Sequence, residues 1–223
     1  MPKNTVSQKV IRAAEEYVRN ILASEGTGHD WYHIDRVRKM GVRIAKQEKV
    51  DASLVELMAL LHELPDHKIV GFGNEDAALE NIKTWLLQQN VSTELCDIIC
   101  YVIKNQSYSA SGVRGEKLTS PEGRVMQDAD RLEALGAIGI ARVFAYGGKT
   151  HRLLYNPTEK PRKRVNAKQY KAVQPSSVTH FYEKLFKLRD LMNTKTGRRI
   201  ATQRHRFMEK FLEEFFAEWK SQK

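Results

Sequence analysis

The chain has 223 residues, of which 37 are Lys or Arg and 27 are Asp or Glu, and it carries a formal net charge of +10. This length is enough for a large hydrophobic core in one domain or two small ones, and a hydrophobic content of 41% excludes a disordered chain. Hydrophobic runs such as Leu57–Leu61 are too short to cross a membrane, and we expect no secretory signal in the first residues. Two cysteines, Cys96 and Cys100, exclude a disulfide framework. We therefore expect a cytoplasmic globular protein that does not insert into membranes.

Hydrophobic residues recur at intervals of three and four along most of the chain, which predicts amphipathic helices. Before residue 150 we expect six such helices: over 6–22, over 30–48, over 53–61, one that Asn74 caps, over 92–104 and over 120–148. Ser53 and Glu56 have the spacing of a capping box at the start of the third, and Pro65 ends it. Two further helices are expected over 178–192 and 200–219. Since no segment alternates with a period of two, the prediction is an all-α fold.

The excess of positive charge is concentrated in residues 147–175, which hold eight Lys or Arg against one acidic residue. A long connection that contains three prolines is often functional. Three interpretations stay open: a solvated loop, a lid that closes over a nucleotide, or a surface that contacts nucleic-acid phosphates. The hydrophobic stripe of the last helix belongs to the core or to a homodimer contact.

Polar residues occupy positions where the helical pattern calls for hydrophobic ones. They are His33, the pair His62 and Glu63, and Asp128 with Asp130. Isolated charge in a core costs several kcal/mol unless it is paired or bound to metal. Separately, each residue has an ordinary explanation, such as a hydrogen-bonded core histidine or a side chain that opposes a helix dipole. Together, they predict a site with nitrogen and oxygen ligands for a divalent cation.

The ordered set His33, His62-Glu63 and Asp130 resembles the HD superfamily of metal-dependent phosphohydrolases, whose pattern is H…HD…D. Further segments resemble its single-domain bacterial YedJ/YpgQ-type group: 28–37, 56–64, 127–142, 144–148 and 180–185. The resemblance covers about residues 26–219. It implies one HD-type helical domain over 1–223, with a motif core at about 26–142, the basic loop at 147–175 and C-terminal helices within 176–220.

The resemblance also implies roles for individual residues. His33, His62, Glu63 and Asp130 would bind one divalent metal ion, with Mn²⁺ favoured and Mg²⁺, Co²⁺, Ni²⁺, Fe²⁺ or Zn²⁺ compatible. Asp66 would orient the attacking water or move a proton; its alternative is an ordinary turn residue after Pro65. Donors to substrate phosphates would be Arg36, Lys68, His29 and His67. Asp128 lies about 200° around the helix from Asp130, so we expect Asp128 and Arg131 to support the site without binding the ion. The implied substrate is a nucleotide, such as a triphosphate cleaved to monophosphate and pyrophosphate.

One residue departs from the family pattern. The family doublet is His-Asp, whereas this chain has His62-Glu63. Glutamate keeps the charge and both oxygens but moves the carboxylate by about one bond length, while metal sites tolerate displacements of only about 0.2 Å without adjustment. Two interpretations follow: an altered but usable ligand, or a degenerate site in a protein that binds nucleotides or nucleic acid without strong catalysis.

Overall fold

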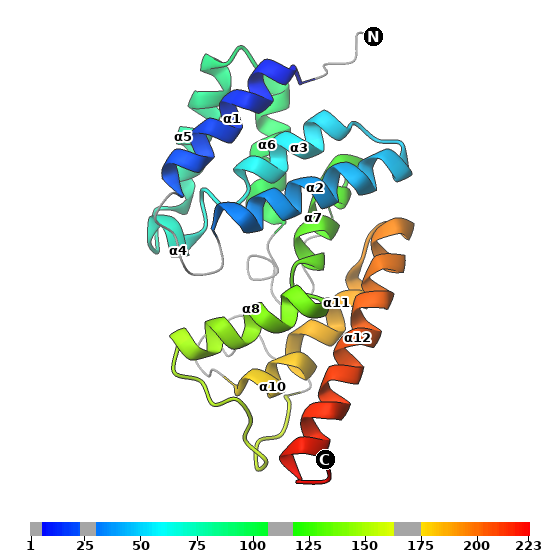
Figure 1. Cartoon of the computed structure of the whole chain (residues 1–223). Helices are drawn as coiled ribbons and strands as arrows, with labels where there is room; N and C mark the ends of the chain where they lie inside the picture. Colours follow the sequence, from blue (N-terminus) through cyan, green and yellow to red (C-terminus); the bar gives the residue numbers. More distant parts are fainter. Residues whose placement is uncertain (1–5, 23–29, 107–117, 163–174) are drawn as a thin grey trace. The chain divides into compact units, whose positions relative to one another are not determined.

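The computed structural model describes residues 6–22, 30–106, 118–162 and 175–223, and within these ranges the side chains of His67 and Lys68 are not described (Figure 1). Every regular element in these ranges is a helix, so the prediction of an all-α fold is confirmed. None of the described helices is long and hydrophobic enough to cross a membrane. The chain divides into two compact units, Met1–Ala129 and Asp130–Lys223. The expectation of one domain over 1–223 stays a prediction.

The first unit is built around a short, very hydrophobic helix. Its elements are α1 (Gln8–Ile21), α2 (Trp31–Glu48), α3 (Ala52–Leu61), α4 (His67–Val70), α5 (Glu75–Gln88), α6 (Thr93–Asn105) and the first nine residues of α7 (Pro121–Leu132). Helix α3 packs against α1, α2 and α6, and residues Leu57–Leu61 have no exposed surface. Because α3 lies at the centre, its C-terminal end carries His62 and Glu63 into a buried environment.

Helix α7 is fixed to the first unit by close contacts. A Cβ atom added at Gly41 in α2 would lie 2.9 Å from the Val55 side chain of α3 and 3.7 Å from that of Ala129 in α7. The side-chain amide of Gln127 donates a hydrogen bond to the backbone carbonyl of Gln106 at the end of α6 (3.1 Å). The absence of a side chain at residue 41 therefore lets α2, α3 and α7 approach closely.

Two helix starts differ from the sequence prediction. Asp51, not Ser53, caps α3, since its Oδ1 accepts from the amides of Ser53 (2.9 Å) and Leu54 (3.2 Å); the predicted capping box is wrong. Asn74 precedes α5 as expected, but the predicted side-chain cap is wrong, since the Asn74 side chain donates to the Val70 carbonyl (2.9 Å) and makes no cap hydrogen bond. That bond ties α5 to the short helix α4, which the pattern did not predict.

The long helix predicted over 120–148 is two helices, α7 and α8 (Gly136–Lys149). Gly136 has φ +75°, a conformation that glycine adopts without strain. A Cβ atom at Gly139 would lie 2.4 Å from the backbone of Ala134. The chain therefore turns after Leu132 and packs the turn against the first turn of α8, so α7 ends two residues beyond Asp130.

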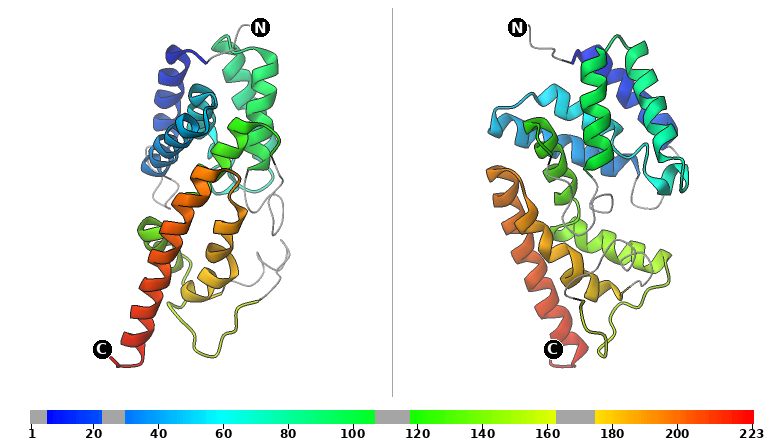
Figure 2. Two further views of the ribbon diagram at one scale, coloured as in Figure 1. Left: turned by 90° about the vertical axis from the view of Figure 1, so that its right-hand side faces the viewer. Right: turned by 180° about the vertical axis from the view of Figure 1, so that it is seen from behind.

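The second unit contains α8 and the elements after the basic loop. These are α10 (Ser177–His180), the π-helix η2 (Phe181–Leu185), α11 (Phe186–Leu188), the 3-10 turn η3 (Arg189–Leu191) and α12 (Lys195–Trp219) (Figures 1 and 2). Helix α12 packs against α8 and η3, and the Phe181 ring, fully buried, stacks on Phe211 at 6.3 Å between centroids. Thr194 caps α12, so this helix begins five residues before the predicted start. The two C-terminal helical segments are otherwise as expected.

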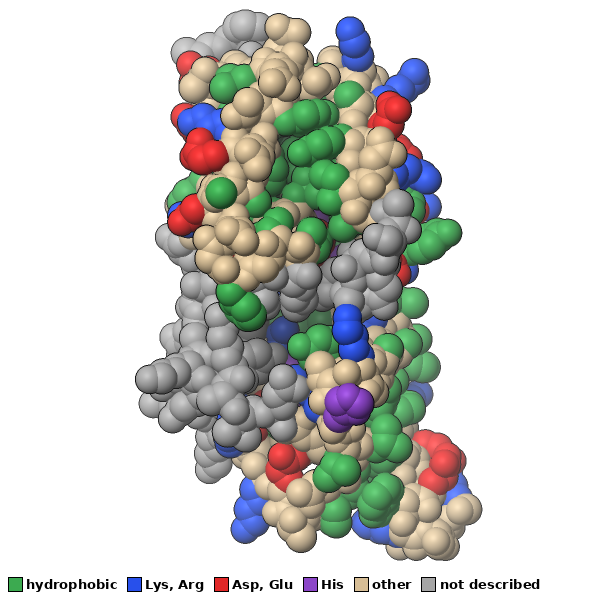
Figure 3. Space-filling model, turned by 90° about the vertical axis from the view of Figure 1, so that its left-hand side faces the viewer, with side chains coloured by type: hydrophobic (Ala, Val, Ile, Leu, Met, Phe, Trp, Pro, Cys, Tyr) green, Lys and Arg blue, Asp and Glu red, His purple; other side chains and the backbone are tan. Residues whose placement is uncertain are grey.

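The basic loop begins at Thr150, because α8 continues to Lys149. Its described part ends at Arg162, and residues 163–174 lie outside the described residues. On α12 the predicted hydrophobic stripe is only partly buried: Met208 is fully buried, whereas half of the surface of Phe207 and of Trp219 is exposed. Hydrophobic side chains also reach the surface on the face shown in Figure 3.

A buried ion pair fastens the described end of the basic loop to η2. Glu183 accepts hydrogen bonds from the Arg162 backbone amide (2.9 Å), Nε (2.8 Å) and Nη2 (2.7 Å). Burial raises the pKa of the Glu183 carboxyl, but the Arg162 bonds and charge outweigh it, so this pKa is lowered. The pair therefore stabilises the fold at pH values above the pKa of a glutamate carboxyl in the unfolded chain, about 4.3. This stability is lost as the pH falls through the lower pKa that the carboxyl has in the folded protein.

We expect Arg162→Met to reduce the free energy of unfolding at pH 7 by about 1.5–3 kcal/mol, because it leaves a buried carboxylate without its charged donors. Urea unfolding across pH 7 to 3 measures this, and the difference from wild type should shrink at the acidic end. Lys160→Met removes an exposed cation two residues away and should change stability by less than about 0.5 kcal/mol. A difference for Arg162→Met that is independent of pH would contradict the proposed contribution of the charge.

Candidate metal centre

The first turn of α2 positions His33. The Asp30 side chain caps this helix by accepting a hydrogen bond from the His33 amide (2.9 Å). The His33 side chain is fully buried, and its Nε2 lies 3.1 Å from Oε1 of Glu63. A polar cap at residue 30 thus fixes the backbone from which this imidazole projects into the interior.

The end of α3 positions His62 and Glu63, both about 5% exposed. Nδ1 of His62 lies 2.7 Å from the Ala59 carbonyl; because a carbonyl only accepts, Nδ1 is the protonated nitrogen and Nε2 is left to bind a cation. This arrangement is common for metal-binding histidines. His62 Nε2 lies 3.3 Å from Oε1 of Glu63, so one carboxylate oxygen faces both imidazoles.

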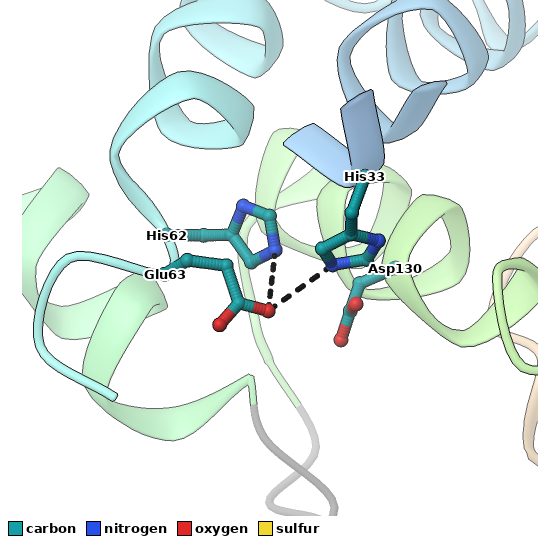
Figure 4. A group of neighbouring side chains, drawn as sticks. All are labelled: His33, His62, Glu63 and Asp130. Atoms are coloured by element: carbon teal, nitrogen blue, oxygen red, sulfur yellow. Dashed lines mark hydrogen bonds and ion pairs between the residues drawn. The ribbon is translucent and has the colours of Figure 1, made fainter. Parts of the chain in front are cut away.

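Asp130 completes the group from α7, where it directly follows Ala129. Figure 4 shows the four side chains directed toward a common point. One ligand atom from each of His33, His62, Glu63 and Asp130 lies within 4.8 Å of the other three. Oxygen and imidazole ligands bind cations such as Zn²⁺ at about 2.0–2.2 Å, so donors on opposite sides of an ion are about 4.0–4.4 Å apart. Small side-chain shifts therefore suffice for these two imidazoles and two carboxylates to hold a divalent cation.

The structure shows where some of the remaining predicted site residues lie and does not describe the others. Asp66 follows Glu63 in the turn, where its amide donates to the Glu63 carbonyl (2.9 Å), and it leads into α4; it is half-buried, as is Arg36 in α2. Asp128 has no exposed surface and Arg131 is 6% exposed, and neither belongs to the four-ligand group. His29 lies outside the described residues, and so do the side chains of His67 and Lys68.

One charged residue that interacts with Asp130 was not predicted from the sequence. Lys184 is half-buried in η2; burial lowers the pKa of its ammonium, and the carboxylate of Asp130 is the largest opposing influence. The two residues are 54 positions apart, so only the fold shows that they interact. The one sequence signal was the segment 180–185, which resembles the family but suggested no role for this lysine.

Comparison with known proteins agrees with this arrangement. Residues 30–135 match the family model of the HD domain, a range that contains all four candidate ligands. YpgQ of Bacillus subtilis is 34% identical over 207 residues, which cover 92% of each chain. The chain belongs to the HD domain family. The resemblance inferred from the sequence is thereby confirmed.

Solved structures of three bacterial proteins share the fold over most of this chain. A protein of Lactobacillus plantarum has a TM-score of 0.85 at 35% identity, with 97% of this chain and all of the other covered. An HD-superfamily hydrolase of Bacillus thuringiensis has a TM-score of 0.75 at 41% identity, with 96% and 98% covered. Bacillus subtilis YpgQ in complex with ADP has a TM-score of 0.73 at 32% identity, with 93% of each chain covered. The HD-type helical fold predicted from the sequence is therefore confirmed, and a divalent cation fits the ligand set.

Proposed function

We propose that this HD protein is a metal-dependent phosphohydrolase that acts on a phosphate ester or anhydride of a nucleotide. The observation that carries the proposal is the convergence of His33, His62, Glu63 and Asp130 within 4.8 Å. Kinship to an HD-superfamily hydrolase supports the reaction class, and the ADP complex of YpgQ supports a nucleotide substrate. A nucleoside triphosphate cleaved to monophosphate and pyrophosphate is the substrate we favour, in the cytoplasm.

Four residues would hold the cation, for which Mn²⁺ is our first choice. A divalent cation in this position lowers the pKa of water and offsets negative charge on a phosphoryl group. Asp66, three residues after Glu63 in the same turn, would orient that water or accept its proton. Arg36, Lys68, His29 and His67 would donate to substrate phosphates, since guanidinium and ammonium groups match phosphate in charge and geometry. Asp128 and Arg131 would support α7 beside Asp130.

One residue, Glu63, favours a second function, the binding of nucleotides without strong catalysis. The family pattern has aspartate there, and a ligand displaced by one methylene gives a site that binds nucleotides but turns them over weakly. The contact between Glu63 Oε1 and both imidazoles, at 3.1 and 3.3 Å, supports the first function over this one, because it shows that the longer side chain reaches the ligand group.

The test is phosphate and pyrophosphate release from a panel of nucleoside mono-, di- and triphosphates. We expect turnover that chelation abolishes and Mn²⁺ restores, with the triphosphates as the best substrates. The dependence on metal separates this activity from that of a contaminating phosphatase that needs none. Binding of ADP without any turnover across the panel and the divalent metals would favour the second function.

A further inference from the structure

Helix α12 runs along one edge of the second unit (Figures 1 and 2). A stripe of exposed side chains follows its middle, made of Arg199, Gln203, Arg206, Phe207 and Lys210. Their spacing places them within about 100° of arc on the helix surface. The stripe is about 16 Å long, since each residue advances the helix by about 1.5 Å. Three cations, an amide and an aromatic ring thus share one exposed face, the basic stripe.

Carboxylates are placed around the basic stripe and not within it. The segment 191–208 contains five Lys or Arg residues and no Asp or Glu. Glu209 lies outside the arc of the stripe, and its Oε1 is 3.3 Å from the imidazole of a buried histidine. Glu213 and Glu214 follow the end of the stripe, and Glu214 pairs with Lys223 (2.6 Å). The face from residue 199 to residue 210 therefore keeps its positive charge.

The order of charges along α12 opposes the helix dipole. Lys195 and Arg198 lie in the first turn, which contains no acidic residue, and the last turn contains no basic one. The dipole favours acidic residues at the start of a helix and basic residues at its end. Charges selected to stabilise this helix would have the reverse order. The positive charge of its first half therefore serves a purpose other than helix stability, and an anionic ligand accounts for it.

An aromatic ring distinguishes the basic stripe from a purely ionic surface. Half of the surface of Phe207 is exposed, directly beside Arg206. A single exposed hydrophobic residue is common on protein surfaces, but here it belongs to a row of cations. Proteins that bind single-stranded nucleic acid combine the same two features, since cations attract the phosphates and unpaired bases stack on aromatic rings. A duplex keeps its bases stacked inside and has no use for the ring.

We propose that the basic stripe of α12 binds single-stranded nucleic acid. Arg199, Arg206 and Lys210 attract phosphates along the strand, Phe207 stacks on a base, and the Gln203 amide hydrogen-bonds to a base edge or a sugar. The net charge of +10 draws polyanions to the protein, and the exposed ring selects a strand with unpaired bases. This inference is independent of the proposed function, because it needs neither the metal group nor turnover.

The test is fluorescence anisotropy of a labelled oligothymidine of about 12 nucleotides, titrated with the full-length chain in chelator at about 0.1 M salt. Each phosphate contact on a single strand contributes about 0.7 to the slope of log affinity against log salt concentration. The double variant Arg199→Gln, Arg206→Gln should therefore bind about 25-fold more weakly, with that slope reduced by about 1.4. Phe207→Ala should weaken binding by about fivefold or more, and Phe207→Tyr should restore it.

The matched control is the double variant Arg43→Gln, Lys46→Gln, which removes two exposed cations from α2 and should bind within about twofold of wild type. Circular dichroism checks that each variant is folded. No binding by wild type, or an equal loss in the control, overturns the proposal. If a DNA duplex or polyglutamate binds as tightly as the single strand and Phe207→Ala has no effect, the stripe serves another polyanion, such as an acidic protein, and its assignment to single strands is wrong.

Discussion

Replacing His62 with alanine is expected to remove the bound divalent cation and to lower turnover by about 10³-fold or more. His62 supplies one of two imidazoles in the ligand group, and its Nδ1 bond to Ala59 directs Nε2 toward Glu63. A catalytic metal ion contributes several kcal/mol of transition-state stabilisation, and each 1.36 kcal/mol is a factor of about ten in rate. Metal content by mass spectrometry and turnover with added Mn²⁺ measure the two effects.

The matched control is His151→Asn, which removes an exposed histidine from the second unit. Residue 151 has φ +56°, and asparagine tolerates this conformation. The control should keep the metal content of wild type. Thermal unfolding separates loss of metal from loss of fold, and His33→Gln repeats the experiment from another helix. A folded His62→Ala protein with full metal content would refute the assignment of the ligands.

The convergence of the four candidate ligands was predictable because polar residues in buried helices are conspicuous. His33 and Asp130 interrupt hydrophobic faces, and His62-Glu63 ends the most hydrophobic helix of the chain. Their order also resembles the H…HD…D pattern of a known family, with glutamate in place of aspartate at residue 63. Lys184 carried no such signal, since a lysine in a helical segment is ordinarily a solvated residue. Only tertiary structure brings the charge of Asp130 to bear on Lys184.

Helix type was predictable from the sequence and helix boundaries were less so. The break between α7 and α8 falls at Glu133-Ala134-Leu135, three residues with good helix propensity. The turn there is set by Gly136 with positive φ and by Gly139, which lets the Ala134 backbone approach α8. The predicted start of α3 was wrong for a related reason, because Asp51 and Ser53 are both good caps and local sequence does not rank them.

Glu63→Asp is expected to weaken binding of the divalent cation by at least about 10- to 100-fold, the loss seen when even supporting residues of a metal site are changed. In this chain Glu63 Oε1 already lies 3.1 Å from His33 Nε2 and 3.3 Å from His62 Nε2. Shortening the side chain withdraws the carboxylate by about 1.5 Å, one carbon–carbon bond, whereas metal ligands tolerate only about 0.2 Å. Restoring the family residue should therefore impair this protein, because its backbone is arranged for the longer side chain.

Glu63→Gln separates the effect of side-chain charge from that of side-chain length, since glutamine keeps the length of glutamate and removes its negative charge. Both variants should bind Mn²⁺ more weakly than wild type in calorimetric titrations, and both should lose turnover on the best nucleotide of the panel. Glu56→Asp shortens a half-buried glutamate of α3 outside the ligand group and should leave metal affinity unchanged. If Glu63→Asp instead binds Mn²⁺ more tightly and raises turnover, glutamate at this position has weakened an ancestral site, and the non-catalytic function becomes the better account of the chain.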